Sequence, residues 1–439
     1  MKLLSILKQK KESLILVTFL SILVLYCFFA GWPGQFWTDS YHAYAQLIIG
    51  TYNDLFSVQF PYHLHILYEL GIANPSYFLN NFLFFILFLR LFDLYNIKDK
   101  SKYIKILILI SMTFVYIHPE TMYIRGFISR DIPFILAILI ASVSIVLSKK
   151  YNWYIFSFIL LGIFSTYRME GILFVLLFLL ASIFQKRYYA SILLLIVFIL
   201  SKIFFIPNSI HDFSYWKSSK IDSLVYFYKN NPKYFTKDKI ILLEEVGGAS
   251  INIMVKDVIP HKQNIYYKKY CRPIHTTSVK QKEFDRMYLN FILNNKLYFL
   301  NYRYEMIVKI IKRNFKHRKY WNIFVPSNYD KLVPLSQEVV GILNIPNYIL
   351  VSFTNKLIVK FFYITYNYII ALILLLFVFL HSLYKKKYIY TFVSVIVGIE
   401  TLLMFLMSPA PYIKYYYMLF LFPLFALGYI SHIFKKDIT

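Results

Sequence analysis

The sequence predicts an all-α, polytopic membrane protein. Of its 439 residues, 59% are hydrophobic, and the mean hydropathy is +0.54. Apolar runs recur along the chain, and several approach the roughly 20 residues that a helix needs to cross a bilayer. A soluble domain of this length could not keep so much apolar surface away from water.

The apolar runs predict about ten membrane-spanning helices by this length criterion. The two runs on either side of residue 168 are short for a full crossing. The orientation of the flanking helices is the same whether both of these runs cross or neither does. The expected helices cover residues 14–31, 80–97, 103–118, 132–148, 152–167, 171–185, 189–206, 358–383, 388–408 and 415–434.

The formal net charge of +26 would suggest a nucleic-acid partner in a soluble protein. Here the basic residues gather in short clusters between expected helices, and such clusters hold the loops of a membrane protein in the cytoplasm. We therefore expect an integral plasma-membrane protein with both termini in the cytoplasm and no nucleic-acid partner. The clusters are Lys8, Lys10 and Lys11; Lys98, Lys100, Lys102 and Lys105; Lys149 and Lys150; Lys186 and Arg187; Lys385 to Lys387; and Lys435 and Lys436.

Two outward-facing segments are too long to be turns. The first covers residues 32–77 and follows the first expected helix, whereas the second covers residues 207–355 and lies between helices 7 and 8. The chain therefore divides into an N-terminal transmembrane module (1–206), an outward-facing domain (207–355) and a C-terminal transmembrane module (356–439).

Asp39 is the first candidate for a catalytic residue, because it lies a few residues beyond the first expected helix. A carboxylate there could take a proton from a substrate hydroxyl at the outer face of the membrane. It could also be the N-cap of a surface helix that begins at Ser40. Asp131 is the second candidate, and it too could cap a helix, the fourth expected one, with Pro133 in the first turn.

The expected topology brings further polar residues to the same outer face. Ionisable side chains at the ends of membrane helices are costly unless they serve a site or a water-filled cavity. A general base surrounded by cations suits a substrate whose leaving group is a phosphate. The candidates for substrate binding are His42, His63, Arg125, Arg130, Arg168, Glu170, Lys414 and Tyr415.

Some of these residues also have simpler interpretations. Arg168 and Glu170 could mark a polar turn, and they are spaced i, i+2, which does not place them on one face of a helix. His63 and His65 have the same spacing, which favours ordinary interfacial histidines over a metal site. Glu400 lies well inside the ninth expected helix, where an acid suggests a function, although a buried partner such as Lys202 or a tyrosine hydroxyl would also account for it.

Four short motifs stand out in this arrangement: Asp39, Gln59-Phe60-Pro61-Tyr62-His63-Leu64, Ser129-Arg130-Asp131-Ile132-Pro133-Phe134 and Pro409-Ala410-Pro411-Tyr412-Ile413-Lys414-Tyr415. They resemble motifs of the GT-C superfamily of integral-membrane glycosyltransferases, especially the protein-mannosyl and lipid A aminoarabinose transferases. Seven expected helices, a large outer segment and a further set of helices also resemble that superfamily. Three departures are Ser40 in place of a second acid, Pro-Tyr-His in place of a double proline, and Lys414 in place of an arginine.

The resemblance implies an inverting glycosyltransferase in a bacterial plasma membrane. Its donor would be a sugar linked to polyprenyl phosphate, and its acceptor a glycan, a glycolipid or a protein of the cell envelope on the outer face. Asp39 would be the base, and membrane lipids would surround the protein. No cofactor is assigned, although a divalent cation, Mg²⁺ or Mn²⁺, is compatible with the resemblance.

Two other functions stay open. An O-antigen-type polysaccharide polymerase or ligase would also have many helices and a large outer segment, but the acid directly after the first helix favours the glycosyltransferase. A flippase or transporter of lipid-linked sugars would bind near the membrane midplane and often carries repeats. The candidate residues instead gather at one face of the membrane, which favours the transferase over the transporter.

Overall fold

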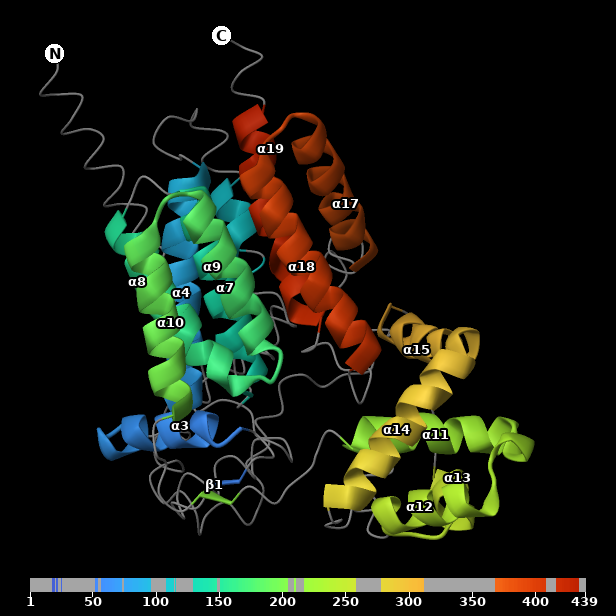
Figure 1. Ribbon diagram of the computed structural model, residues 1–439. Helices are drawn as coiled ribbons and strands as arrows, with labels where there is room; N and C mark the ends of the chain where they lie inside the picture. Colours follow the sequence, from blue (N-terminus) through green and yellow to red (C-terminus); the bar gives the residue numbers. More distant parts are fainter. Residues whose placement is uncertain are drawn as a thin grey trace, which may run out of the picture.

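The computed structural model of the chain is mostly helical (Figure 1). It describes residues 52–53, 57–72, 75–95, 108–113, 115, 129–147, 151–203, 209–210, 217–257, 278–311, 368–407 and 416–433, together with residues 18, 19, 21, 22 and 25. The all-α class predicted from the sequence is therefore confirmed for the described residues. Strand structure there is limited to β1 (Tyr52–Asn53) and β2 (Ser209–Ile210), which pair in parallel.

Eight long helices of the described part run alongside one another as a bundle (Figure 1). The structure divides them into a first group of five and a second group of three, and the groups meet where α19 contacts α4 and α7. The helices are α4 (Pro75–Tyr95), α7 (Asp131–Val146), α8 (Tyr151–Phe164), α9 (Gly171–Phe184), α10 (Tyr188–Ile203), α17 (Tyr368–Tyr384), α18 (Tyr388–Met407) and α19 (Tyr417–Ile433).

Helix α7 lies at the centre of this bundle. Every residue from Asp131 to Ile145 is buried, as expected for a helix that is apolar on all sides. In contrast, α9, α10 and α17 leave large apolar side chains exposed along their outer faces, with Leu176, Ile199 and Leu376 exposed by 50%, 40% and 58%. Exposed apolar surface on several adjacent helices is typical of a protein that contacts lipid.

Two described helices, Pro75–Tyr95 and Tyr388–Leu406, are long and apolar enough to cross a membrane by length and composition. The other six bundle helices are apolar but shorter. These findings support membrane association, while ten crossings stay a prediction. The expected helices 14–31 and 103–118 lie largely outside the described residues.

The two ends of the bundle differ in charge. At one end, a turn with Lys186 and Arg187 joins α9 to α10, and a turn with Lys385 to Lys387 joins α17 to α18. At the other end, helix α3 (Gln59–Glu69) lies across the bundle, close to the 3₁₀ turn η3 (Ser165–Tyr167) that follows α8 (Figure 1). The basic clusters of the described part thus lie on one side, as the sequence predicts for loops that face the cytoplasm.

The two basic turns share one structural motif. Lys186 and Lys386 both adopt positive φ angles, 58° and 54°. In each turn, the residue after this lysine donates its backbone N–H to a serine carbonyl, that of Ser182 or of Ser382. The same serine hydroxyl contacts a hydroxyl nine residues further on, at 2.8 Å between Ser382 and Thr391. The helical hairpin α9–α10 therefore recurs as α17–α18, and both copies have the same orientation in the bundle.

A second helical unit lies next to the C-terminal end of α18 (Figure 1). Its own core joins apolar side chains of α11, α12, α13, α14 and α15, and Leu406 of α18 packs against this core. These helices fall inside 207–355, and the bounds of an outward-facing domain there stay a prediction. They are α11 (Lys217–Asn230), α12 (Lys237–Gly247), α13 (Ile251–Asp257), α14 (Ser278–Asn294) and α15 (Lys296–Ile311), with the short 3₁₀ turn η4 (Pro232–Tyr234).

Candidate functional site

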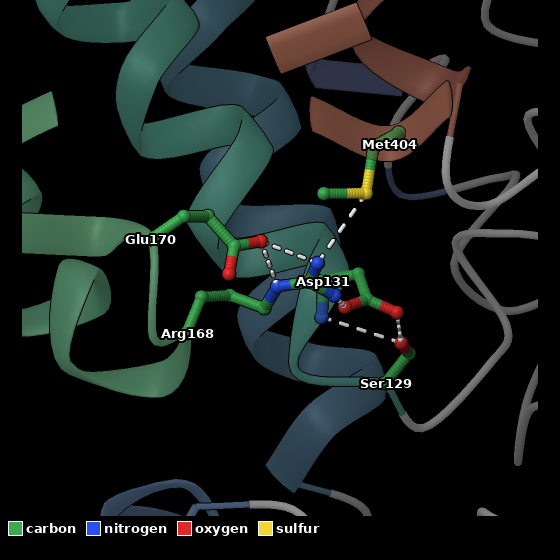
Figure 2. A network of polar contacts seen from close by, with 5 residues as sticks. All are labelled: Ser129, Asp131, Arg168, Glu170 and Met404. Carbon is green, nitrogen blue, oxygen red and sulfur yellow. Dashed lines mark hydrogen bonds and ion pairs between the residues drawn. The ribbon is translucent and has the colours of Figure 1, made fainter. Parts of the chain in front are cut away.

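Arg168 lies at the centre of a buried polar network at the α3 end of the bundle (Figure 2). Its guanidinium forms ion pairs with the carboxylates of Asp131 and Glu170. Ser129 Oγ donates a hydrogen bond to the second oxygen of Asp131 at 2.9 Å. Arg168 Nη2 also contacts the sulfur of Met404 at 3.3 Å. The network therefore joins α7, the turn before α9 and α18.

The turn between η3 and α9 gives Arg168 and Glu170 their positions. Arg168 has an extended backbone (φ −130°, ψ 146°), whereas Glu170 already adopts helical angles as the N-cap of α9. Side chains two residues apart can converge in such a turn, although they would diverge on a continuous helix. Gly171 permits the turn, because a Cβ at this position would lie 1.8 Å from the carbonyl oxygen of Ser165.

Asp131 is not the N-cap of α7. The N-cap is Arg130, and Asp131 is the first residue of the helix. The backbone N–H of Asp131 donates to Ser129 Oγ at 3.3 Å, while its carboxylate binds Arg168 and Ser129. The capping interpretation of Asp131 is therefore wrong, and its carboxylate belongs to the network. A negative charge in the first turn also suits the positive end of the helix dipole.

Two carboxylates share one guanidinium in this network. The side chains of Arg168, Asp131 and Glu170 are 12%, 6% and 9% exposed, so little water screens them. An arginine that is neutralised in this way is poorly suited to bind a phosphate, and the geometry favours Arg168 as a residue that positions the two carboxylates.

Glu400 of α18 is a further acid next to the network. It is 1% exposed, and its Oε2 atom has no hydrogen-bond partner in the described part of the structure. Its electrostatic interactions are with Arg168, Glu170 and Asp131. Lys202, which the sequence suggested as a partner for Glu400, instead donates to the backbone carbonyl of Thr166 at 3.4 Å.

His63 connects helix α3 to this region. Its Nδ1 atom lies 3.0 Å from the hydroxyl of Tyr167, the residue before Arg168. Phe60 packs edge-on against the same tyrosine, with the ring centroids 5.2 Å apart. Burial lowers the pKa of His63 from 6.5 to about 4, so the imidazole is neutral near pH 7. Helix α3 is thus tied to the turn that carries Arg168.

The structure brings Asp131, Arg168 and Glu170 together. His63 does not contact them directly, but it contacts Tyr167, which directly precedes Arg168. Arg130 directly precedes α7 and is partly buried. Within the described ranges, no group of three or more His, Cys, Asp or Glu side chains could hold a metal ion. The predicted site residues outside the described residues are Asp39, His42, Arg125, Lys414 and Tyr415.

Sequence reasoning did not place Met404 or Glu400 in this network. Met404 gives no signal, because an apolar helix with a methionine is ordinary. Glu400 does give one: it is the single charged residue among the apolar residues of α18. An acid alone in such a helix indicates a buried polar partner or a functional site.

The arrangement has a clear chemical capacity. Buried carboxylates accept hydrogen bonds from hydroxyl groups and attract protons. They disfavour an anionic group in direct contact with them, because like charges repel. No protein-family model matches the chain, and no curated protein and no solved structure shows significant similarity to it.

Proposed function

We propose that this protein is a multi-pass membrane enzyme, an inverting glycosyltransferase that uses a sugar linked to polyprenyl phosphate. The observation that carries the proposal is the buried network of Asp131, Arg168 and Glu170 at one end of the helix bundle. A positioned Asp or Glu carboxylate can take a proton from a hydroxyl group that lies within hydrogen-bond reach. The acceptor is a component of the cell envelope on the outer face of the plasma membrane.

The membrane topology has independent support. The outer faces of α9, α10 and α17 expose large apolar side chains. The basic turns at Lys186 and Lys386 lie at the end of the bundle opposite to the acidic network. Positive loops face the cytoplasm in membrane proteins, so this orientation directs the network and the unit α11–α15 outward.

In the proposed reaction, the acceptor hydroxyl oxygen attacks the anomeric carbon on the face opposite to the phosphate. The bond between that carbon and the phosphate oxygen breaks, the configuration inverts, and the phosphate leaves on its lipid. The hydroxyl proton passes to a carboxylate. Asp39 is the candidate base, and Asp131 and Glu170 are the candidates to orient the acceptor hydroxyl group.

The leaving phosphate needs a cation that is not already neutralised. Arg168 is paired with two acids, so the better candidates among the predicted residues are Arg125, Arg130 and Lys414. The unit α11–α15 contacts α18 near Leu406, and it is the natural candidate for recognition of the acceptor. A divalent cation is not required by this scheme.

The test is mass spectrometry of surface glycans and glycolipids from a deletion strain. The strain is complemented with the wild type, Asp39→Asn, Asp131→Asn or Glu170→Gln, at matched membrane levels. Lys385→Gln is the control, because Lys385 is exposed in the basic turn at the end of the bundle opposite to the network. We expect one fixed sugar mass to be lost in the deletion strain and restored by the wild type and the control only.

Other outcomes are informative. Single repeat units that accumulate in the deletion strain would assign the protein as a polysaccharide polymerase. Unchanged surface glycans in the deletion strain would contradict a transferase of the cell envelope. Full restoration by Asp131→Asn and Glu170→Gln would show that the buried network has no part in the reaction.

A further inference from the structure

Glu400 combines two features that rarely occur together. It is the single Asp, Glu, Lys or Arg residue of α18, and it is 1% exposed. Its Oε2 atom is buried and has no hydrogen-bond partner in the described part of the chain. An ionised carboxylate oxygen in such surroundings carries a large desolvation cost, which a proton removes.

The neighbouring charges reinforce this cost. Helix α7 brings Asp131 towards Glu400, and the turn before α9 brings Arg168 and Glu170. If Glu400 were ionised, three carboxylates would lie near the Arg168 guanidinium. Like charges that share a site disfavour a further ionised acid. The other elements packed on α18 bring these titratable groups: His381 and Tyr368 of α17, Tyr417 and Tyr429 of α19, and Arg303 and Glu305 of α15.

The contacts of Arg168 agree with a neutral Glu400. Arg168 Nη2 contacts the sulfur of Met404 at 3.3 Å (Figure 2). Met404 lies four residues after Glu400, so both side chains are on the same face of α18. A thioether is a weak acceptor. An ionised carboxylate one turn away would compete strongly for this N–H group, and the structure has no hydrogen bond between Arg168 and Glu400.

We infer that Glu400 is a proton-binding residue that positions Arg168. When Glu400 is protonated, the Arg168 guanidinium holds Asp131 and Glu170 together. When Glu400 releases its proton to water, its carboxylate attracts Arg168 Nη2 away from Met404 and weakens the ion pairs of Arg168 with Asp131 and Glu170. Glu400 acts through Arg168 and is a positioning residue. Its consequence for sugar transfer rests on the function proposed above.

Infrared spectroscopy of the purified protein in lipid nanodiscs tests proton binding directly. We expect the wild type near neutral pH to show the carbonyl stretch of a protonated carboxylic acid, and Glu400→Gln to lose that band. Glu245→Gln should keep it. A wild type without the band, or a Glu400→Gln variant that retains it, would overturn the inference. If Glu400→Gln does not fold, Glu400→Asp replaces it, and the band should shift in frequency.

The positioning role has its own readout. In a transfer assay over a series of rising pH values, the wild type should lose activity once Glu400 ionises, whereas this decline should be absent in Glu400→Gln. A decline of the same shape in both proteins would overturn the positioning role. The infrared band does not depend on transfer. A band assigned to Glu400 in a protein without transferase activity would therefore refute the proposed function and leave the proton site intact.

Discussion

Arg168 shows how much of this site depends on one side chain. Its guanidinium binds Asp131 through Nη1 and Glu170 through Nε and Nη2. Only arginine has donors arranged to bind two carboxylates in different directions, because a lysine ammonium is a single compact charge. Asp131 comes from α7, whereas Arg168 and Glu170 come from the turn before α9, so the network holds α7 against the start of α9.

Replacement of Arg168 by methionine should destabilise the protein strongly. The variant leaves the buried carboxylates of Asp131 and Glu170 without their cation, and loss of one partner of a buried ion pair typically costs about 3–5 kcal/mol. Thermal unfolding in nanodiscs measures the change. The triple variant Arg168→Met, Asp131→Asn, Glu170→Gln removes the orphaned charges and should recover most of the loss. Equal unfolding temperatures for the single and triple variants would contradict this account.

His63 makes the attachment of α3 dependent on pH. Burial lowers its pKa to about 4, compared with 6.5 when α3 is detached and the imidazole is solvated. Between pH 4 and 6.5, the detached state therefore binds more protons than the attached state. The free energy that favours attachment of α3 is thus largest above pH 6.5 and decreases as the pH falls towards 4. One pKa unit corresponds to about 1.4 kcal/mol, which makes the total effect at most about 3 kcal/mol.

Hydrogen exchange of peptides from α3 tests this prediction. After correction for intrinsic rates, protection of residues 59–69 should be lower near pH 5 than near pH 7. Helix α8 provides the internal control, because its protection should change little. His63→Phe keeps a ring against Tyr167 but cannot be protonated, and it should remove the pH dependence. A pH dependence that persists in His63→Phe would assign the effect to another group.

At the scale of elements, the turn between η3 and α9 positions the network. Gly171 is required there by a close approach to the backbone of Ser165. In α18, Gly398 has a different role, since a Cβ there would meet no atom within 4 Å. A side chain at position 171 would therefore clash with its surroundings, whereas one at position 398 would not, so the two glycines can be compared directly.

We expect Gly171→Ala and Gly398→Ala to have opposite effects. A Cβ at position 171 would lie 1.8 Å from a carbonyl oxygen, so the turn must open and the positions of Arg168 and Glu170 must change. In α18, alanine removes the conformational cost of a helical glycine and should stabilise by about 0.5–1 kcal/mol. Thermal unfolding of both variants in nanodiscs gives the comparison. A Gly171→Ala variant as stable as the wild type would show that the turn does not require glycine.

At the scale of the whole molecule, the bundle separates its charges by end. The repeated hairpins α9–α10 and α17–α18 carry basic turns at one end, and the acidic network lies at the other. Both hairpins have the same orientation, unlike the inverted repeats of many transporters. The unit α11–α15 adds a second core, joined to the bundle through α18.

Cysteine labelling of intact cells should distinguish the two ends. Serine first replaces Cys27 and Cys271, the two cysteines of the chain. A cysteine is then placed at Lys386, in a basic turn, or at Lys233, in η4, where both side chains are exposed. A membrane-impermeant maleimide should label Lys233→Cys in intact cells and Lys386→Cys only after permeabilisation. The reverse pattern would contradict an outward-facing network.

The sequence predicted the helices better than the site. The expected ranges 132–148, 171–185 and 388–408 agree closely with α7, α9 and α18, because long apolar runs fix the extent of a helix. The contact of His63 with Tyr167 joins residues 104 positions apart. Periodicity carries no information on such a pair, since it depends on how the elements pack.

The convergence of Arg168 and Glu170 was missed for a related reason. Their i, i+2 spacing argues against contact on a helix, but the chain there is an extended residue followed by a helix start. Lys202, which the sequence suggested as a partner of Glu400, instead donates a hydrogen bond to the carbonyl of Thr166. Depth in the membrane can be read from a sequence, whereas the direction in which a side chain faces cannot.

The lengths of α9 and α10 have a consequence for the surrounding bilayer. These helices have 14 and 16 residues, or about 21 and 24 Å at a rise of 1.5 Å per residue. A typical hydrocarbon core is about 30 Å thick. On the proposed topology, thinning of the lipid next to these helices is one way to match their length. The outer headgroups on that side would then descend towards the bundle, and the lipid-linked phosphate of the proposed donor would arrive at the depth of the acidic network instead of above it.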